Sequence, residues 1–244
     1  MTYNELCRRL SPLYGEGEAR AIVRMVVEDE FGLSPTDIYM GKVNQLSADE
    51  RANLEEIVAR IANYEPVQYV LGHADFSGRR FAVAPGVLIP RPETALLIPM
   101  IGSAAARPFT LLDIGTGSGI LAIAALKLGA ASAEGVDIDP VAVRTAGENA
   151  ALNGVQDKLT VLVGDLSDKA SGTYDIITAN IVANAILSLA PAVPGLMAEG
   201  ATFIASGIID SRKDEVIAGL EKAGLSVVEV KEKRGWECIV CKKA

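Results

Sequence analysis

Apolar residues in the first part of the chain recur with the spacing of a helix. Residues 16–27 carry apolar side chains at positions i, i+3 and i+4, and Gly32 is a typical residue for the end of that helix. A second helical stretch begins at Ser47, where Glu50 completes a capping box. The pattern predicts a small helical domain over residues 1–70.

The following stretch, residues 71–109, has a different pattern. Residues 76–83 contain a Ser77-Gly78 turn between apolar positions, which predicts a β-hairpin. A proline-rich segment then runs over residues 85–92. We expect residues 71–109 to form a hairpin and a linker between two domains.

From residue 110 onward, short apolar runs alternate with helical stretches, as in a parallel sheet with crossover helices. Arg234-Gly235 separates the last two runs and favours an antiparallel hairpin. The predicted strands are 110–114, 133–137, 159–163, 174–179, 201–206, 225–231 and 236–241. Residues 110–244 are therefore predicted to form an α/β, Rossmann-like domain with a seven-stranded, mostly parallel sheet that ends in an antiparallel hairpin.

The composition narrows the class of protein. With 50% hydrophobic and 22% charged residues, the chain of 244 residues has the composition of a globular protein. Its net charge of -8 argues against direct nucleic-acid binding, because such binding needs clustered cations. The N-terminus has no signal-peptide pattern and no apolar run is long enough to span a membrane, so we expect a cytoplasmic protein.

The cysteines and the single histidine give weak signals. Cys238 and Cys241 have the spacing of a redox or metal pair, but on a strand the two thiols would point to opposite faces. No second pair completes a zinc site, so we expect no metal. A histidine side chain can act as a general base, but nothing else in the sequence indicates a proton relay at His73.

A glycine-rich loop follows the first predicted strand and opens a helix. Glycines here let the backbone approach a ligand, and the helix N-terminus offers free N–H groups. The third glycine comes two residues after the second, unlike the G-x-G-x-x-G spacing of dinucleotide sites. The loop residues that we predict to bind a cofactor are Asp113, Gly115, Thr116, Gly117, Ser118 and Gly119.

Polar residues also follow the next three predicted strands. Asp137 can accept hydrogen bonds from both ribose hydroxyls of a nucleoside, and Ile138 can cover one face of an adenine. Asp165 and Leu166 follow the third strand, where the carboxylate can reach an adenine amino group, although Gly-Asp is also a common loop dipeptide. Asn180 follows the fourth strand.

Asn180 is the predicted catalytic residue. Its amide oxygen can accept the N–H of a nucleophilic nitrogen and fix the direction of the lone pair without being a competing nucleophile. The other interpretation is that Asn180 caps the helix that follows.

Residues 65–72, together with Phe76, Phe81 and residues 85–94, resemble the release-factor glutamine methyltransferases. The resemblance implies that the N-terminal domain docks a release factor and that an Asn-Pro-Pro-Tyr motif holds the target glutamine. Asn180 matches the first residue of that motif, but residues 181–183 are Ile-Val-Ala.

From about residue 110 the chain instead resembles the ribosomal-protein methyltransferases that modify protein L11 of the large subunit. The matching pieces are 115–125, 135–140, 179–181 and 205–209. This resemblance implies S-adenosylmethionine as cofactor and lysine or N-terminal amines as acceptors. A Pro-Gly…Glu-Thr segment is common to both families. By analogy Thr94 and Asn180 line the cofactor pocket, while Arg91, Glu93, Asn180 and Ile181 contact the substrate.

We therefore expect a mosaic, joined between residues 95 and 110, that is an S-adenosylmethionine-dependent protein methyltransferase of the Rossmann-like class I fold. The first expected acceptor is the glutamine amide of a peptide chain release factor. The alternative is ribosomal protein L11, or a chain that binds the cofactor but turns over weakly, because the Pro-Pro-Tyr motif is missing.

Three rival classes stay open. A nicotinamide oxidoreductase is disfavoured by the glycine spacing and the predicted terminal hairpin. A module that binds the cofactor without catalysis is a second rival. A nucleic-acid methyltransferase is disfavoured by the acidic balance and the missing Pro-Pro-aromatic motif.

Overall fold

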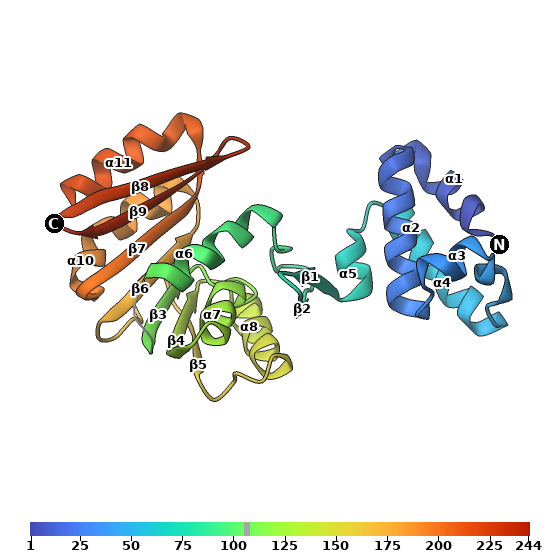
Figure 1. Cartoon of the computed structure of the whole chain (residues 1–244), viewed down its shortest axis with the longest axis horizontal. Helices are drawn as coiled ribbons and strands as arrows, with labels where there is room; N and C mark the ends of the chain where they lie inside the picture. Colours follow the sequence, from blue (N-terminus) through green and yellow to red (C-terminus); the bar gives the residue numbers. More distant parts are fainter. Residues whose placement is uncertain (105–107) are drawn as a thin grey trace. The chain divides into compact units, whose positions relative to one another are not determined.

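The computed structural model describes residues 1–104 and 108–244, apart from the side chains of Pro92 and Glu93. The chain forms two compact units, Met1–Ala74 and Asp75–Ala244 (Figure 1). Most of the predicted linker, residues 71–109, thus belongs to the second unit. None of the helices in the described ranges is long and apolar enough to cross a membrane.

The first unit is helical, as its apolar periodicity predicts. The capping box at Ser47 is confirmed, since the Glu50 amide donates to Ser47 Oγ at 3.2 Å and the Ser47 amide donates to Glu50 Oε2 at 2.7 Å. Gly32 ends the long second helix in the left-handed conformation. The elements are α1 Tyr3–Tyr14, α2 Glu16–Phe31, α3 Pro35–Tyr39, the 3-10 helix η1 Lys42–Gln45, α4 Ala48–Ala62 and α5 Val67–Leu71.

The second unit contains a seven-stranded sheet in the order β5-β4-β3-β6-β7-β9-β8. The first five strands in this order are parallel, and β9 pairs antiparallel with both β7 and β8, so the predicted sheet is confirmed. The strands are β3 Phe109–Ile114, β4 Ala130–Asp137, β5 Leu159–Val163, β6 Tyr174–Asn180, β7 Met197–Ile209, β8 Leu225–Lys233 and β9 Trp236–Lys243.

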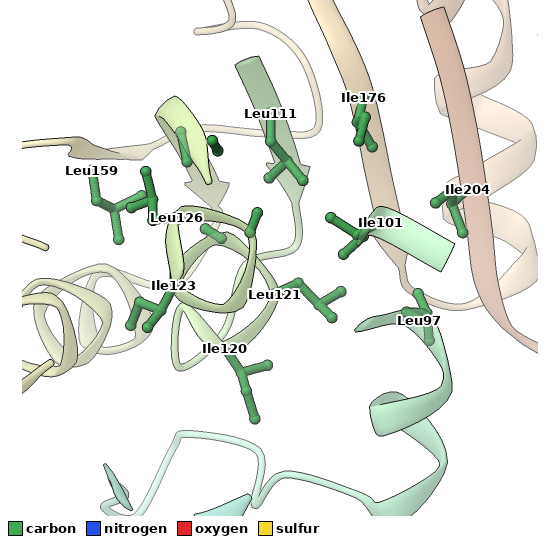
Figure 2. Close-up of a cluster of buried hydrophobic side chains, with 14 of the residues drawn as sticks. Leu97, Ile101, Leu111, Ile120, Leu121, Ile123, Leu126, Leu159, Ile176 and Ile204 are labelled. Atoms are coloured by element: carbon green, nitrogen blue, oxygen red, sulfur yellow. The ribbon is translucent and has the colours of Figure 1, made fainter. Parts of the chain in front are cut away.

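Helices cover both faces of this sheet (Figure 1). One face packs against η2 Pro92–Leu96, α6 Leu97–Ala104, α7 Ile120–Lys127 and α8 Pro140–Leu152. The other face packs against α9 Ala183–Leu189, η3 Ala190–Ala192, α10 Val193–Leu196 and α11 Lys213–Lys222, which follows η4 Asp210–Arg212. Figure 2 shows the first core, where Ile101 of α6 and Leu121 of α7 meet Leu111 and Ile176 of the sheet. Because the central strands are buried on both faces, they appear in the sequence as continuous apolar runs.

Both predicted hairpins are present and close with the same backbone turn. Strands β1 His73–Phe76 and β2 Arg79–Ala82 form a two-stranded sheet around Ser77 and Gly78, and β8 and β9 flank Arg234 and Gly235. All four turn residues have positive φ, between 49° and 79°. This is the type I′ geometry, whose twist matches that of the strands it joins.

Candidate active site

The glycine-rich loop connects β3 to α7 at the carboxyl edge of the sheet. The amides of Gly115 and Thr116 both donate to the carbonyl of Val136, at 2.8 and 3.1 Å, which lays the loop over the end of β4. Gly115 has φ +70°, and a Cβ there would lie 2.3 Å from Cγ2 of Ile181. Gly117 has φ +55°, and a Cβ there would meet no atom within 4 Å. The loop is therefore tightly packed at its first glycine and open at its second.

Asp137 ends β4 beside this loop. Its Oδ2 accepts the Gly117 amide at 2.8 Å and its Oδ1 accepts the Asp139 amide at 3.0 Å. The next residue, Ile138, is 68% exposed, so a large apolar side chain at this edge is uncovered. Asp165 is exposed and Leu166 has φ +51°; both follow β5, whose end is tied to β4 by the Gly164 amide donating to the Asp137 carbonyl.

Asp113 lies beneath the loop and is 1% exposed. Its two carboxylate oxygens accept the hydroxyl groups of Thr116, at 2.8 Å, and Thr178, at 2.7 Å. Burial raises the pKa of this carboxyl to about 6, although the two hydroxyl hydrogen bonds oppose the shift. Both carboxylate oxygens thus accept hydrogen bonds from protein hydroxyls, and Asp113 connects the loop to β6.

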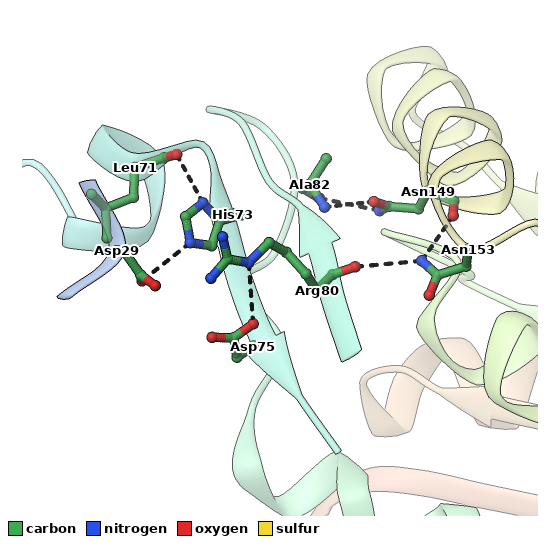
Figure 3. Close-up of polar contacts among 8 residues, drawn as sticks. All are labelled: Asp29, Leu71, His73, Asp75, Arg80, Ala82, Asn149 and Asn153. Atoms are coloured by element: carbon green, nitrogen blue, oxygen red, sulfur yellow. Dashed lines mark hydrogen bonds and ion pairs between the residues drawn. The ribbon is translucent and has the colours of Figure 1, made fainter. Parts of the chain in front are cut away.

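Asn149 supports the loop from α8. Its Nδ2 donates to the carbonyl of Ser118 at 2.8 Å and to that of Ala82 at 3.1 Å, while its Oδ1 accepts the Ala82 amide at 2.5 Å. Figure 3 shows the amide of this fully buried side chain against Ala82 of β2. One amide thereby joins the hairpin, α8 and the glycine loop.

Asn180 ends β6 and faces two adjoining cavities. Its Nδ2 donates to Oγ1 of the buried Thr94 at 3.2 Å. The larger cavity has a volume of about 190 Å³ and the smaller about 60 Å³; Leu88, Arg91, Thr94 and Asn180 line both. The larger one is completed by Ile181, Val182, Ser206, Gly207 and Trp236, and the smaller one by Pro90, Asp113, Gly115, Thr116, Gly117, Ser118, Ile120 and Leu121.

Close backbone contacts fix the position of Asn180. The Ile181 amide donates to the Ser206 carbonyl at 3.1 Å. Gly207 interrupts the pairing of β7 with β9, and with φ +81° it brings its Cα under the Asn180-Ile181 backbone. A Cβ on Gly207 would lie 2.8 Å from the Ile181 carbonyl oxygen and 3.1 Å from Oδ1 of Asn180. On the far wall of the larger cavity, the Arg91 guanidinium lies 5.6 Å from the ring centroid of Trp236.

The structure brings together most of the residues that were predicted to form the site. Arg91, Thr94, Asp113, loop residues 115–118, Asn180 and Ile181 line the two cavities, and Asp137 contacts the loop directly. Gly119, the last predicted residue of the loop, lines neither cavity. Ile138, Asp165 and Leu166 lie at the same sheet edge but line neither cavity. The side chain of Glu93, predicted to contact the substrate, lies outside the described part of the chain.

Sequence reasoning missed Leu88, Val182, Ser206, Gly207 and Trp236 as cavity residues. Two signals were available. Gly207 interrupts an apolar strand pattern, and Trp236 is the only tryptophan of the chain.

His73 and the cysteine pair have structural surroundings. His73 belongs to the first unit, where Nδ1 is 3.0 Å from the Leu71 carbonyl and Nε2 is 3.2 Å from the Asp29 carboxylate (Figure 3). Cys238 packs in the core on one face of the sheet and Cys241 in the core on the other, as the strand alternation predicts. Within residues 1–104 and 108–244, no three His, Cys, Asp or Glu side chains are grouped to hold a metal ion.

Two family models match separate regions of the chain. The PrmC N-terminal domain matches residues 3–72, and ribosomal protein L11 methyltransferase (PrmA) matches residues 91–244. The predicted mosaic of two families is confirmed. The L11-type match begins upstream of the predicted join between residues 95 and 110, which fits the packing of Arg91 and Thr94 against the cavities of the second unit.

Curated relatives carry the same family name. The L11 methyltransferase of Desulfitobacterium hafniense is 51% identical over 126 residues, which is 52% of this chain and 40% of the relative. That of Pelotomaculum thermopropionicum is 45% identical over 133 residues, 54% of this chain and 43% of the relative. The chain spans about two fifths of the length of these relatives.

Solved structures confirm the predicted fold of a class I methyltransferase. A TehB-like SAM-dependent methyltransferase from Corynebacterium glutamicum has a TM-score of 0.51 at 17% identity, over 60% of this chain and 86% of its own, and so shares the fold alone. An L11 methylase from Lactobacillus delbrueckii subsp. bulgaricus has a TM-score of 0.62 at 33% identity, over 66% of this chain and 83% of its own. Since this match and the family model agree over the unit that holds the cavities, the chain belongs to the ribosomal protein L11 methyltransferase family.

Proposed function

We propose that the second unit catalyses methyl transfer from S-adenosylmethionine to a nitrogen atom of a protein, and that the acceptor is an amine of ribosomal protein L11. The observation that carries this proposal is the position of Asn180, which lies between the glycine loop and a cavity open to a second molecule.

The residues of the loop fit the cofactor. Gly117 leaves open space where a side chain would stand, and the Asp137 carboxylate beside it can exchange its amide contact for the hydroxyls of a ribose. Ile138, with its exposed side chain, is placed to cover an adenine, and Asp165 follows the neighbouring strand. When bound there, S-adenosylmethionine supplies an electrophilic methyl group on a positively charged sulfur.

Asn180 orients the acceptor nitrogen. Its amide nitrogen is engaged by Thr94, so its amide oxygen serves to accept an N–H from the acceptor. Gly207 and Ile181 hold the backbone of Asn180 in place. Positioning of this kind lowers the barrier because the entropy of alignment is lost on binding and not in the reaction step.

The lining of the larger cavity favours a neutral acceptor. Its described residues include no carboxylate, histidine or lysine that would take a proton, and the Arg91 guanidinium repels an ammonium group. An amine therefore reacts in its deprotonated form. The Pro-Pro-Tyr residues that would surround a glutamine amide are replaced by Ile181, Val182 and Ala183.

A pH profile distinguishes an amine acceptor from an amide. For a lysine, with an ordinary pKa of about 10.4, the neutral fraction rises about tenfold per pH unit between pH 7 and pH 9, and kcat/KM should rise with it. For an α-amino group the rise should level off near pH 8. A glutamine amide does not titrate in this range, so a flat profile would contradict an amine acceptor.

The family favours ribosomal protein L11 over the release factor that was first expected. Such an acceptor places the reaction in the cytoplasm.

The test offers purified L11 and purified release factor separately, with labelled S-adenosylmethionine and an intact-mass readout. We expect label on L11 and its loss in Asn180→Ala, while cofactor binding by calorimetry is retained. Label on the release factor alone would show that the acceptor is wrong but that methyl transfer to a protein is right. Label on neither protein would reject the proposal.

A further inference from the structure

A second, larger hollow adjoins the candidate active site. It has a volume of about 730 Å³, within the range of ligand-binding clefts, and lies between α6 and the β9-β8 hairpin. Ser206 and Trp236 line both this groove and the 190 Å³ cavity. The groove therefore leads directly to the place where we expect the acceptor nitrogen.

The floor of the groove is apolar and extended. Along β9 it is formed by Trp236, Cys238 and Val240, alternate residues that face the same side of the strand. Ile204 of β7 pairs with Val240 and continues this floor, and Met100 of α6 lies 3.9 Å, sulfur to sulfur, from Cys238. From Trp236 to Lys242 the strand rises about 20 Å, the length of an extended segment of about six residues.

The rim of the groove carries charges of both signs. Its cations are Lys231, Lys233 and Lys242, and its anion is Glu229, whose carboxylate lies 3.2 Å from Nζ of Lys231. Glu232 and Glu237 are paired on the opposite face of the hairpin, where Glu237 is buried beside Lys213. An apolar floor with a mixed polar rim is the anatomy of a protein interface.

We infer that this groove holds an extended segment of the acceptor protein next to the methylated residue. A nitrogen on a protein is attached to peptide chain, which runs in both directions from a lysine and in one direction from an N-terminal amine. The groove continues the active-site cavity in one direction. The segment directs alternate side chains onto the apolar floor, and the rim lysines meet its carbonyls or carboxylates. This inference rests on the proposed function, and it assigns recognition of the acceptor sequence to the second unit.

The test blocks the groove without touching the cavity. Ser103 is an exposed residue of α6 that lines the groove, and its hydroxyl donates to the Pro99 carbonyl four residues earlier at 3.0 Å. Ser188 of α9 is its matched control, because it is an exposed helical serine that donates to the Asn184 carbonyl at the same spacing and 3.0 Å, and it lines neither cavity. We therefore compare Ser103→Trp with Ser188→Trp in the full chain.

Two acceptors are compared, so that an effect on docking in the groove can be distinguished from an effect on methyl transfer itself. One is intact L11, and the other is the capped tripeptide acetyl-Gly-Lys-Gly-amide, which is too short to reach from the cavity to Ser103. We expect Ser103→Trp to lower kcat/KM for L11 at least tenfold, chiefly through KM, and to change tripeptide turnover by less than twofold. Ser188→Trp should change neither by more than twofold, and calorimetry should give both variants the cofactor affinity of the unchanged chain.

The outcomes separate failure of the proposed function from failure of the groove alone. If the unchanged chain methylates neither acceptor, the proposed function fails and this inference fails with it. If the unchanged chain is active and Ser103→Trp equals Ser188→Trp on L11, only the groove is refuted. The double variant Lys231→Glu/Lys233→Glu, on the exposed strand β8, covers the case in which Ser103→Trp does not fold. It should raise KM for L11 at least fivefold, and an unchanged KM would refute the groove equally.

Discussion

Replacing Asn149 by alanine should remove the hydrogen bonds that connect the glycine loop, through α8, to the β1-β2 hairpin. The change removes three hydrogen bonds and leaves two carbonyls, of Ser118 and Ala82, and the Ala82 amide without this partner. Each bond contributes about 1 kcal/mol, and an unsatisfied buried group such as the Ser118 carbonyl adds about 1–3 kcal/mol. We expect the free energy of unfolding of the second unit to fall by about 4 kcal/mol.

Asn153→Ala is the matched control for this change. Asn153 lies one turn further along α8 and makes more exposed contacts, to the Arg80 carbonyl at 3.4 Å and to the Asn149 carbonyl at 3.0 Å (Figure 3). Its loss should cost less than about 1 kcal/mol. Trp236, the single tryptophan, lies in the second unit, so its fluorescence during urea denaturation reports the unfolding of that unit. If the free energies of unfolding of the two variants agree within about 1 kcal/mol, the Asn149 hydrogen bonds do not stabilise the loop.

Other expectations concern the residues around Asn180 and Asp113. Gly207→Ala should lower kcat at least tenfold and leave cofactor affinity within about threefold, because the added Cβ would press on the Ile181 carbonyl. An unchanged kcat would contradict the close packing at Gly207. Gly17→Ala is the control, because Gly17 is at an open helical position where an added Cβ should do no harm. Asp113→Asn should flatten the pH dependence of stability. Because burial raises the pKa of Asp113 to about 6, the unchanged chain binds a proton more tightly when folded, so this carboxyl's contribution is fully present below about pH 4 and declines as pH rises through 6. The decline should total about 3 kcal/mol, about 1 kcal/mol of it between pH 5 and pH 7, and parallel curves for the two proteins would disprove it.

Local patterns were enough to predict which residues meet at the glycine loop. The loop and Asp137 belong to one strand–helix–strand unit, in which chain geometry alone brings the end of one strand beside the next. The contacts of Asp113 were harder to predict from the sequence. It lies opposite Thr178 in the pairing of β3 with β6, and only the strand order brings that threonine, 65 residues away, to its carboxylate.

The larger cavity depended on contacts that no local pattern contains. Trp236 and Gly207 reach the cavity because β9 folds back beside β7 at a bulge. Strand β7 itself spans Met197–Ile209, twice the length predicted from its apolar core at 201–206. Its ends are extended by pairing with β6 and β9, which outweighs the weak strand preference of Gly200 and Gly207.

The three cysteines provide a built-in readout of how each unit opens. Cys7 is buried in the first unit, and Cys238 and Cys241 are buried on opposite faces of the sheet in the second. Burial raises the pKa of Cys7, and raises the pKa of Cys238 and of Cys241 to about 12, so these thiols react slowly with alkylating reagents while the protein is folded. Mass spectrometry of thiol labelling over time would then follow the opening of the first unit through one cysteine and that of the second unit through the other two, in a single unmodified chain.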